Sequence, residues 1–253
     1  MSGAPATALT VRGLNKSFGA LVVARDIGME LPVGARHALI GPNGAGKTTL
    51  VNMITGALKP DSGSIALMSE DITALPPVRT VSRGLVRTFQ ITNLFPRLRV
   101  WENLALAVAS GTGADRHLLR ALPRQSAVLD EVAELAKQVH LADDIGRPVQ
   151  ELPYGRQRLV ELAMALALRP RVLLLDEPAA GVPSMETGQL LEVLQALPED
   201  MAILMIDHDM DLVFRYARRI TVLVGGAVLA EGTPGEIRAD ERVRDVYLGR
   251  RHG

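Results

Sequence analysis

The sequence contains no cysteine among its 253 residues, so neither a disulfide framework nor a thiolate metal site can form. It also lacks any apolar run near the ~18 residues that span a bilayer. The longest such run, residues 162–168, is rich in alanine and lies between charged residues. Residues 1–8 do not show the basic-then-apolar pattern of a signal peptide. We therefore expect a chain that suits a reducing cytosol and does not cross a membrane by itself.

An excess of either charge is also absent, because 28 basic side chains balance 28 acidic ones. Proteins that bind nucleic acid through its phosphates usually carry a basic surplus or stripe. The balance therefore predicts no nucleic-acid partner. Arg242, Arg244, Arg250 and Arg251 near the C-terminus could meet lipid head groups or a partner, although a solvated tail is the simpler interpretation.

What the chain does contain is a complete phosphate-binding loop, Gly41-Pro42-Asn43-Gly44-Ala45-Gly46-Lys47-Thr48-Thr49. Glycines let the backbone turn so tightly that consecutive N–H groups point at one anion. Lys47 can reach the β- and γ-phosphates of a nucleoside triphosphate, and the Thr48 hydroxyl can bind Mg²⁺. Residues 35–40 predict a strand before the loop, and residues 48–58 predict a helix whose N-terminus faces the phosphates. This context disfavours a chance glycine-rich turn and predicts nucleotide binding.

The remaining pattern predicts a mixed α/β core interrupted by a helical subdomain at roughly residues 90–155. The expected strands are 9–11, 21–31, 62–67, 172–175 and 202–206, with a hairpin at 220–224 and 227–230. The expected helices are 154–168, 189–197 and 211–217. From residue 101 to about 141 the pattern is helical, with an amphipathic stripe at Val128, Val132, Leu135 and Val139. That stripe packs on its own domain or, alternatively, binds a partner.

Polar residues follow the predicted strands where a nucleotide would collect. Asp176 can hold Mg²⁺, and Glu177 can orient or deprotonate the attacking water; an ordinary helix cap is the alternative. His208 can donate a hydrogen bond to the γ-phosphate, although a lone histidine is often structural. Gln90 lies where the core meets the helical insert, so its amide can bind Mg²⁺ and move when the γ-phosphate leaves.

In this order the motifs resemble the ATP-binding-cassette (ABC) ATPases over residues 9–248. The resemblance implies an α/β fold: a P-loop NTPase core of ABC ATPase type with an antiparallel β subdomain and an inserted helical subdomain. It implies one nucleotide-binding domain, residues 1–253, with its core at 9–89 and 156–248 and a helical signature subdomain at 90–155. The implied cofactors are ATP and Mg²⁺.

The resemblance also assigns a role to each motif. Phe18 matches the aromatic residue that stacks on adenine, where tyrosine is more usual. The catalytic residues would be Lys47, Gln90, Glu177 and His208, and the Mg²⁺ ligands Thr48, Gln90 and Asp176. In this family two subunits pack head to tail, and each phosphate loop is closed by the signature helix of the other subunit. The signature L-S-G-G-Q falls on residues 152–156, so ATP would be bound in trans by Pro153, Tyr154, Gly155 and Arg156.

Further segments resemble one branch, the ATPases of branched-chain amino acid importers, which also serves amides and urea. These segments are Arg87-Thr88-Phe89-Gln90-Ile91, Tyr154-Gly155, residues 176–181, Asp207-His208-Asp209-Met210 and Val246-Tyr247-Leu248-Gly249. The branch implies a second ATPase subunit in a hetero- or homodimer, two transmembrane permease subunits and an extracytoplasmic solute-binding protein. It places the chain at the cytoplasmic face of the cell membrane. Residues 92–101 would then line a groove for a permease helix or, equally, pack as core beneath the insert.

Two prolines depart from the family pattern. Pro153 stands where the signature has serine, which removes a hydroxyl and an N–H that could face the γ-phosphate in trans. Losing one charge-assisted hydrogen bond costs about 1.5–3 kcal/mol. Pro183 stands where the family places aspartate or asparagine in a loop that contacts the other subunit. We therefore expect a heterodimer in which the site on this chain's phosphate loop hydrolyses ATP and the site using its signature helix is weaker.

Two other functions stay open at this point. One is a soluble, non-transport ABC ATPase acting in DNA repair or on the ribosome, but such proteins usually carry two cassettes or a long coiled-coil insertion. The other is a regulatory cassette that binds ATP with weak catalysis, against which the intact Glu177 and His208 argue. Among transport functions, the sequence is compatible with export as well as import, because the ATPase chemistry is the same in both directions.

Overall fold

The computed structural model describes residues 6–88, 94–111 and 126–248. Contacts divide the chain into two compact units. The core unit comprises residues 1–85, 171–176 and 198–253, and the helical unit comprises residues 86–170 and 177–197. In the described part of the chain, no helix has both the length and the apolar character needed to cross a membrane.

An antiparallel sheet in the core unit has the strand order β2-β1-β4-β5. Its strands are β1 (Thr7–Phe18), β2 (Leu21–Pro32), β4 (Ser62–Leu67) and β5 (Glu70–Asp71). Leu9, Val11 and Leu14 on β1 are buried, while Arg12 between them is exposed. One face of the sheet therefore covers the core, as the predicted antiparallel β subdomain requires.

A second sheet has the order β10-β9-β3-β8-β7-β6. Its strands are β3 (Arg36–Ile40), β6 (Leu85–Thr88), β7 (Val172–Asp176), β8 (Ala202–Ile206), β9 (Arg219–Val224) and β10 (Ala227–Gly232). The four strands β9, β3, β8 and β7 run parallel, and β10 is antiparallel to β9. Every residue of β3 and β8 is buried, because parallel strands are covered on both faces. The predicted hairpin around Gly225 and Gly226 is present as β9–β10.

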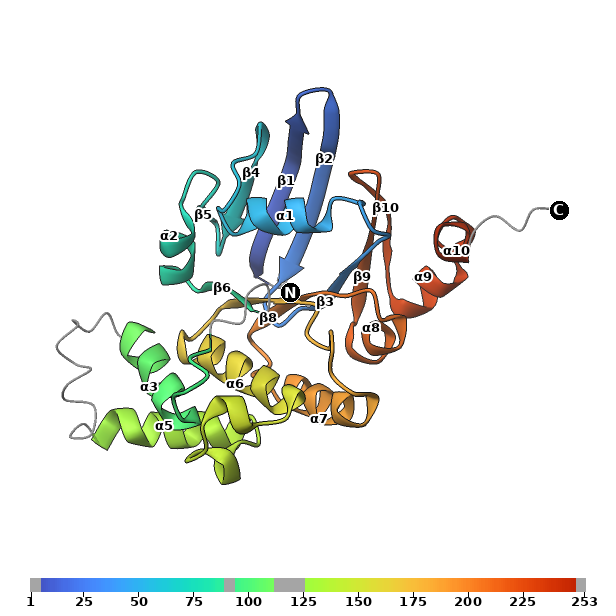
Figure 1. Ribbon diagram of the computed structural model, residues 1–253. Helices are drawn as coiled ribbons and strands as arrows, with labels where there is room; N and C mark the ends of the chain where they lie inside the picture. The colour runs from blue at the N-terminus through green and yellow to red at the C-terminus, as the bar shows by residue number, and fades with distance from the viewer. Residues whose placement is uncertain (1–5, 89–93, 112–125, 249–253) are drawn as a thin grey trace, which may run out of the picture. The chain divides into compact units, whose positions relative to one another are not determined.

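Helix α1 (Lys47–Ile54) follows β3 and joins the two sheets into one core. It crosses the β1–β2 hairpin in Figure 1. Its buried residues Leu50, Val51, Met53 and Ile54 share a hydrophobic cluster with residues of both sheets, including Leu9 and Leu174. The helix that begins at the phosphate loop is therefore held by apolar packing on both sides.

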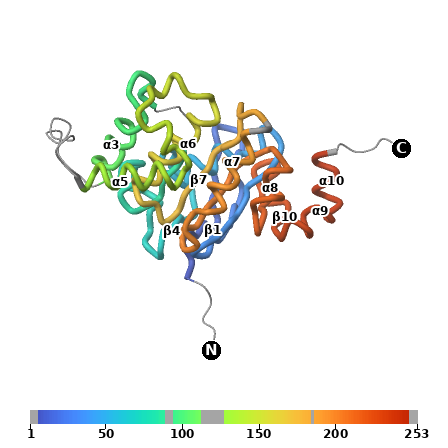
Figure 2. The backbone as a smooth tube through the Cα atoms, turned by 90° about the horizontal axis from the view of Figure 1, so that it is seen from below, coloured from blue at the N-terminus to red at the C-terminus, as the bar shows by residue number. Residues whose placement is uncertain are grey.

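A second hydrophobic cluster holds the C-terminal helices against the parallel sheet. These helices are α8 (Met210–Tyr216), α9 (Pro234–Ala239) and α10 (Glu241–Leu248). They gather on the side of β10 in Figure 2. Val213, Ile237 and Val243 pack with Ile40 and Val222 of the sheet. The sequence pattern predicted α8 but not α9, α10 or the short helix α2 (Pro77–Ser82).

The helical unit contains α3 (Val100–Gly111), α5 (Ser126–Gln138), α6 (Tyr154–Ala167) and α7 (Ser184–Gln195), with short 3-10 turns at Ala142–Asp144 and Val149–Glu151. The predicted stripe on α5 is buried at Val128, Val132 and Leu135. The predicted core boundary at residue 156 does not coincide with the division by contacts. Helix α6 groups with the helical unit because it packs against α3, α5 and α7.

Candidate functional site

The phosphate loop has a backbone that only glycine can adopt at its tightest points. Gly44 and Gly46 have φ values of 79° and 100°, in the region that L-residues avoid. A Cβ atom on Gly46 would lie 2.6 Å from the carbonyl oxygen of Val23, and one on Gly41 would lie 2.2 Å from that of Leu223. The backbones of strands β2 and β9 therefore pack directly against the loop, and no side chain would fit at Gly41 or Gly46.

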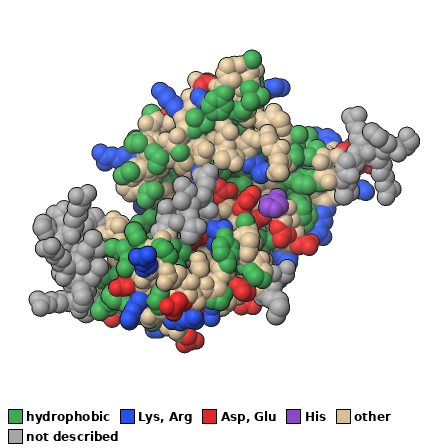
Figure 3. All heavy atoms as spheres, in the orientation of Figure 1, with side chains coloured by type: hydrophobic (Ala, Val, Ile, Leu, Met, Phe, Trp, Pro, Cys, Tyr) green, Lys and Arg blue, Asp and Glu red, His purple; other side chains and the backbone are tan. Residues whose placement is uncertain are grey.

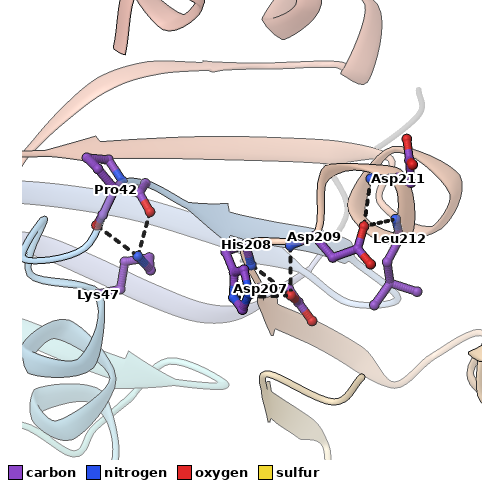
Figure 4. Close-up of polar contacts among 8 residues, drawn as sticks. Pro42, Lys47, Asp207, His208, Asp209, Asp211 and Leu212 are labelled. Atoms are coloured by element: carbon purple, nitrogen blue, oxygen red, sulfur yellow. Dashed lines mark hydrogen bonds and ion pairs between the residues drawn. The ribbon is translucent and has the colours of Figure 1, made fainter. Parts of the chain in front are cut away.

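Lys47 occupies the inside of this loop. Its Nζ donates hydrogen bonds to the carbonyl oxygens of Gly41, at 2.6 Å, and Pro42, at 3.0 Å (Figure 4). Thr48 and Thr49 follow in the first turn of α1, with Thr48 exposed and Thr49 half-buried. A glycine cradle, an ammonium group and a helix N-terminus together fit a chain of phosphates.

The strand order brings two other predicted residues to the same sheet edge. Leu39 of β3 pairs with Ile206 of β8, and Ile206 pairs with Asp176 of β7. Because these strands are parallel neighbours, the phosphate loop, the His208 turn and Asp176 all leave the sheet at its C-terminal edge. The half-buried carboxylate of Asp176 and the exposed hydroxyl of Thr48 are oxygen donors of the kind that Mg²⁺ prefers.

His208 projects from a turn that is fixed by a neighbour the sequence analysis did not single out. The Asp207 Oδ1 atom accepts hydrogen bonds from the backbone N–H groups of His208, at 2.7 Å, and Asp209, at 2.9 Å (Figure 4). Burial raises the pKa of the Asp207 carboxyl, and the same two hydrogen bonds oppose that rise. The His208 side chain itself is 65% exposed. Asp207 therefore fixes the backbone conformation of the turn that carries the exposed His208 side chain.

Asp209 continues this turn into α8. Its side chain caps the helix by accepting hydrogen bonds from the N–H groups of Asp211, at 3.0 Å, and Leu212, at 3.1 Å. An aspartate after a buried strand and before a helix is a common turn and cap residue. That pattern is the signal by which the roles of Asp207 and Asp209 could have been found.

Glu177 is exposed and follows Asp176 directly. Its φ of 50° lies in the left-handed region, which is rare for a residue other than glycine, asparagine or aspartate. Such a conformation costs about 1–3 kcal/mol and is concentrated at functional positions. It turns the backbone sharply at the end of β7, and the Ala180 N–H closes the turn on the Glu177 carbonyl at 3.1 Å.

Phe18 lies at the end of β1 with 54% of its surface exposed. The Nζ atom of Lys16 lies 5.6 Å from the centre of its ring. Phe18 pairs with Leu21 across the hairpin, and Val23 on the same strand β2 contacts the phosphate loop through its carbonyl. An exposed aromatic face near this loop is what a stacking role on a base requires.

The predicted signature region lies in the helical unit. Pro153 is the residue before α6 and gives it no side-chain cap. Tyr154 is 41% exposed, and Gly155 is buried. The guanidinium of Arg156 donates to the His140 carbonyl and lies 3.4 Å from the Asp144 carboxylate. Arg156 is thus anchored within its own unit.

Two other predicted features lie wholly or partly beyond what the structure describes. Gln90 lies outside the described residues, as do residues 92 and 93 of the predicted permease groove. Of the described remainder of that segment, Phe95 is 51% exposed, and its backbone is bound by the buried Asn103 side chain. The role of Gln90 and the groove remain predictions.

Acidic and basic side chains are interspersed over the face of the molecule in Figure 3. Partly exposed ion pairs of the described residues include Lys16–Asp61 at 2.6 Å and Arg83–Glu70 at 2.5 Å. This mixture agrees with the balanced composition.

Comparisons with known proteins agree with this geometry. The ABC transporter family model matches residues 24–180. A second model, of the branched-chain amino acid ATP-binding cassette transporters, matches residues 227–253. The chain is 41% identical to the high-affinity branched-chain amino acid transport ATP-binding protein LivG of Salmonella typhimurium, over 95% of this chain and 97% of that protein.

Two further comparisons extend this picture. The lipopolysaccharide export system ATP-binding protein LptB of Escherichia coli is 34% identical, again over 95% of this chain and 97% of that protein. Among solved structures, the ADP conformation of MJ1267, an ATP-binding cassette of an ABC transporter, superposes with a TM-score of 0.84. It is 28% identical, and the match covers 96% of this chain and 99% of that one.

Proposed function

Because the chain belongs to the family of ABC transporter ATPases, we propose that it hydrolyses ATP to energise the import of branched-chain amino acids or related small polar solutes. One observation carries the ATPase half of this proposal. The phosphate loop, Asp176 and His208 leave three neighbouring parallel strands at one sheet edge. The import half rests on the likeness to LivG and on the C-terminal match at residues 227–253.

The residues of the core unit bind and orient the nucleotide. Phe18 stacks on the adenine, the loop N–H groups hold the phosphates, and Lys47 neutralises part of their charge. Thr48 and Asp176 would hold Mg²⁺, with Gln90 as a further ligand. When bound, the ion would supply positive charge that offsets the negative charge of the phosphates.

Two side chains act around the γ-phosphate. Glu177 accepts a proton from the attacking water or orients it, which typically contributes 10²–10⁴-fold to a rate. His208 donates a hydrogen bond to the γ-phosphate, and its exposure leaves it able to respond when that phosphate departs. Asp207 acts through His208 as a positioning residue.

The proposal extends to the assembly. Two ATPase subunits, two permeases and an extracytoplasmic binding protein would form the transporter, with this chain at the cytoplasmic face of the membrane. Pro153, Tyr154, Gly155 and Arg156 at the start of α6 would close the partner subunit's phosphate loop. ATP then joins the two subunits, and its hydrolysis releases them.

A transport assay tests the function directly. The chain is purified from membranes with its co-purifying permeases, reconstituted in vesicles with the binding protein, and supplied with ATP on the subunit's side. We expect uptake of radiolabelled leucine that requires ATP. Lys47→Ala, which removes the ammonium from the loop, and Glu177→Gln should each abolish at least nine-tenths of this uptake.

Other outcomes point elsewhere. Co-purification with ribosomes or DNA in place of permeases would contradict a transport role. ATP hydrolysis that responds to lipopolysaccharide and not to amino acids would favour export, the activity named for LptB. Amides or urea in place of leucine would keep the importer and change only the solute.

A further inference from the structure

The N-terminus of α6 is capped by a residue from another helix. Pro153 precedes α6 and offers no side-chain acceptor. The backbone N–H of Gly155, in the first turn, instead donates to Oε2 of Glu186 at 3.1 Å. Glu186 lies in the first turn of α7. The N–H groups of a first helical turn have no partner within their own helix, so a carboxylate there is a favourable cap.

This contact brings the Glu186 side chain very close to the backbone of α6. A Cβ atom at position 155 would lie 2.1 Å from Oε2 of Glu186 and 3.2 Å from its Cβ. The carboxylate therefore occupies the space directly in front of the Gly155 N–H. A second anion cannot take the same hydrogen bond while Glu186 holds it.

The segment between Glu177 and α7 packs on the same helix end. Gly181 has a φ of 75°, and a Cβ there would lie 3.0 Å from the Tyr154 ring. The Arg158 guanidinium lies 5.0 Å from the centre of that ring and pairs with Glu161 at 2.9 Å. The Arg158 guanidinium also donates to the Ala180 carbonyl at 3.4 Å, so the segment that leads to α7 is held against α6.

We propose that Glu186 is an internal competitor for the γ-phosphate at the signature helix. This inference rests on the proposed function, in which that helix faces ATP on the partner subunit. The Glu186 carboxylate and the γ-phosphate are both anions that seek the Gly155 N–H. Closure of that site must either displace Glu186 or bring its negative charge close to the γ-phosphate. Glu186 therefore makes the free energy of ATP-dependent subunit association less favourable.

A charge-only substitution tests this. Glu186→Gln keeps the shape and an amide oxygen that accepts a hydrogen bond, but it removes the negative charge. The full-length chain carries Glu177→Gln throughout, so that ATP is bound without turnover. Its association with the partner ATPase subunit is measured by analytical ultracentrifugation in ATP and Mg²⁺, with and without Glu186→Gln.

We expect Glu186→Gln to tighten this association about fivefold, because a charged acceptor holds an N–H roughly twice as strongly as a neutral one. Glu186→Ala, which removes the acceptor, should shift the constant in the same direction. Glu192→Gln is the matched control: it removes one charge from an exposed position on the same helix and should leave the constant unchanged.

The outcomes separate the two proposals. An unchanged or weakened association in Glu186→Gln, with normal ATP-dependent association in the Glu177→Gln parent, would overturn the competitor role alone. If neither protein associates in response to ATP, the proposed function fails, and the role of Glu186 fails with it.

Discussion

A buried titratable side chain makes the free energy of unfolding depend on pH, and His37 in the core unit is the clearest case. It is only 1% exposed. Its Nε2 lies 2.8 Å from the Thr221 hydroxyl, which in turn donates to Glu231 at 3.1 Å. Arg219 pairs with the same glutamate at 2.6 Å. Burial lowers the pKa of His37 to about 4, and Glu231 opposes this only in part.

Acid should therefore destabilise the protein through His37. Above its ordinary pKa of 6.5 the imidazole is neutral in both the folded and the unfolded chain. As the pH falls from 6.5 toward 4, the unfolded chain takes up a proton that the folded chain does not, and stability is lost. Between pH 7 and 5 this amounts to about 2 kcal/mol.

Urea unfolding at both pH values measures this effect against a variant that cannot titrate. His37→Gln retains a hydrogen-bonding group toward Thr221, so its stability should fall by about 2 kcal/mol less over the same interval. Equal losses in the two proteins would mean that folding does not lower the pKa of His37.

At the scale of single elements, α9 depends on its cap. Thr233 accepts from the Glu236 N–H at 3.3 Å, and Glu236 accepts from the Thr233 N–H at 2.7 Å, which is a capping box. Ile237 on this helix is buried in the cluster that includes Ile40 and Val243. A short helix fixed in this way orients the segment leading to α10.

Thr233→Ala should lower the free energy of unfolding by about 1 kcal/mol, because it leaves a first-turn N–H without its acceptor. Glu236→Gln is the comparison: it keeps the reciprocal hydrogen bond and should cost less. Chemical denaturation of both variants checks this order. A larger loss for Glu236→Gln would indicate that charge at the helix end outweighs the cap.

Element prediction succeeded where the apolar pattern was strong. The buried runs of β7 and β8 and the β9–β10 hairpin were predicted within a residue or two. Helix α10 was missed because it is only eight residues long and half of them are charged. Helix α9 was missed although Thr233, Pro234 and Glu236 match the usual sequence pattern of a helix N-terminus. The Gly155–Glu186 contact could not be predicted, because no local rule links positions 31 residues apart.

For the whole molecule, the comparisons confirm the predicted family and fold. For the two motif prolines the sequence predicts a weakened contact with a second subunit, and this stays a prediction. Pro153 and Pro183 precede α6 and α7, and neither helix receives a side-chain cap from its own start. We expect both changes to affect what this chain offers a partner, while its own phosphate loop retains its glycines and Lys47.

We therefore expect two unequal ATP sites in the assembled transporter. Glu177→Gln in this chain should remove most of the ATP turnover, and the matching change in the partner subunit should remove much less. Steady-state ATPase rates of the two single variants, in otherwise identical complexes, decide the point. Equal losses would show that Pro153 does not weaken the site to which it contributes.

The position of β3 in its sheet has a consequence for how the chain is made. β3 pairs with β8 on one side and with β9 on the other. During translation, residues 36–40 therefore emerge long before either partner strand exists, and their backbone groups have no ladder to join. The strand that carries the phosphate loop is completed only after residue 224 has been synthesised. We therefore expect the nascent chain to gain nucleotide binding only after β8 and β9 have been synthesised.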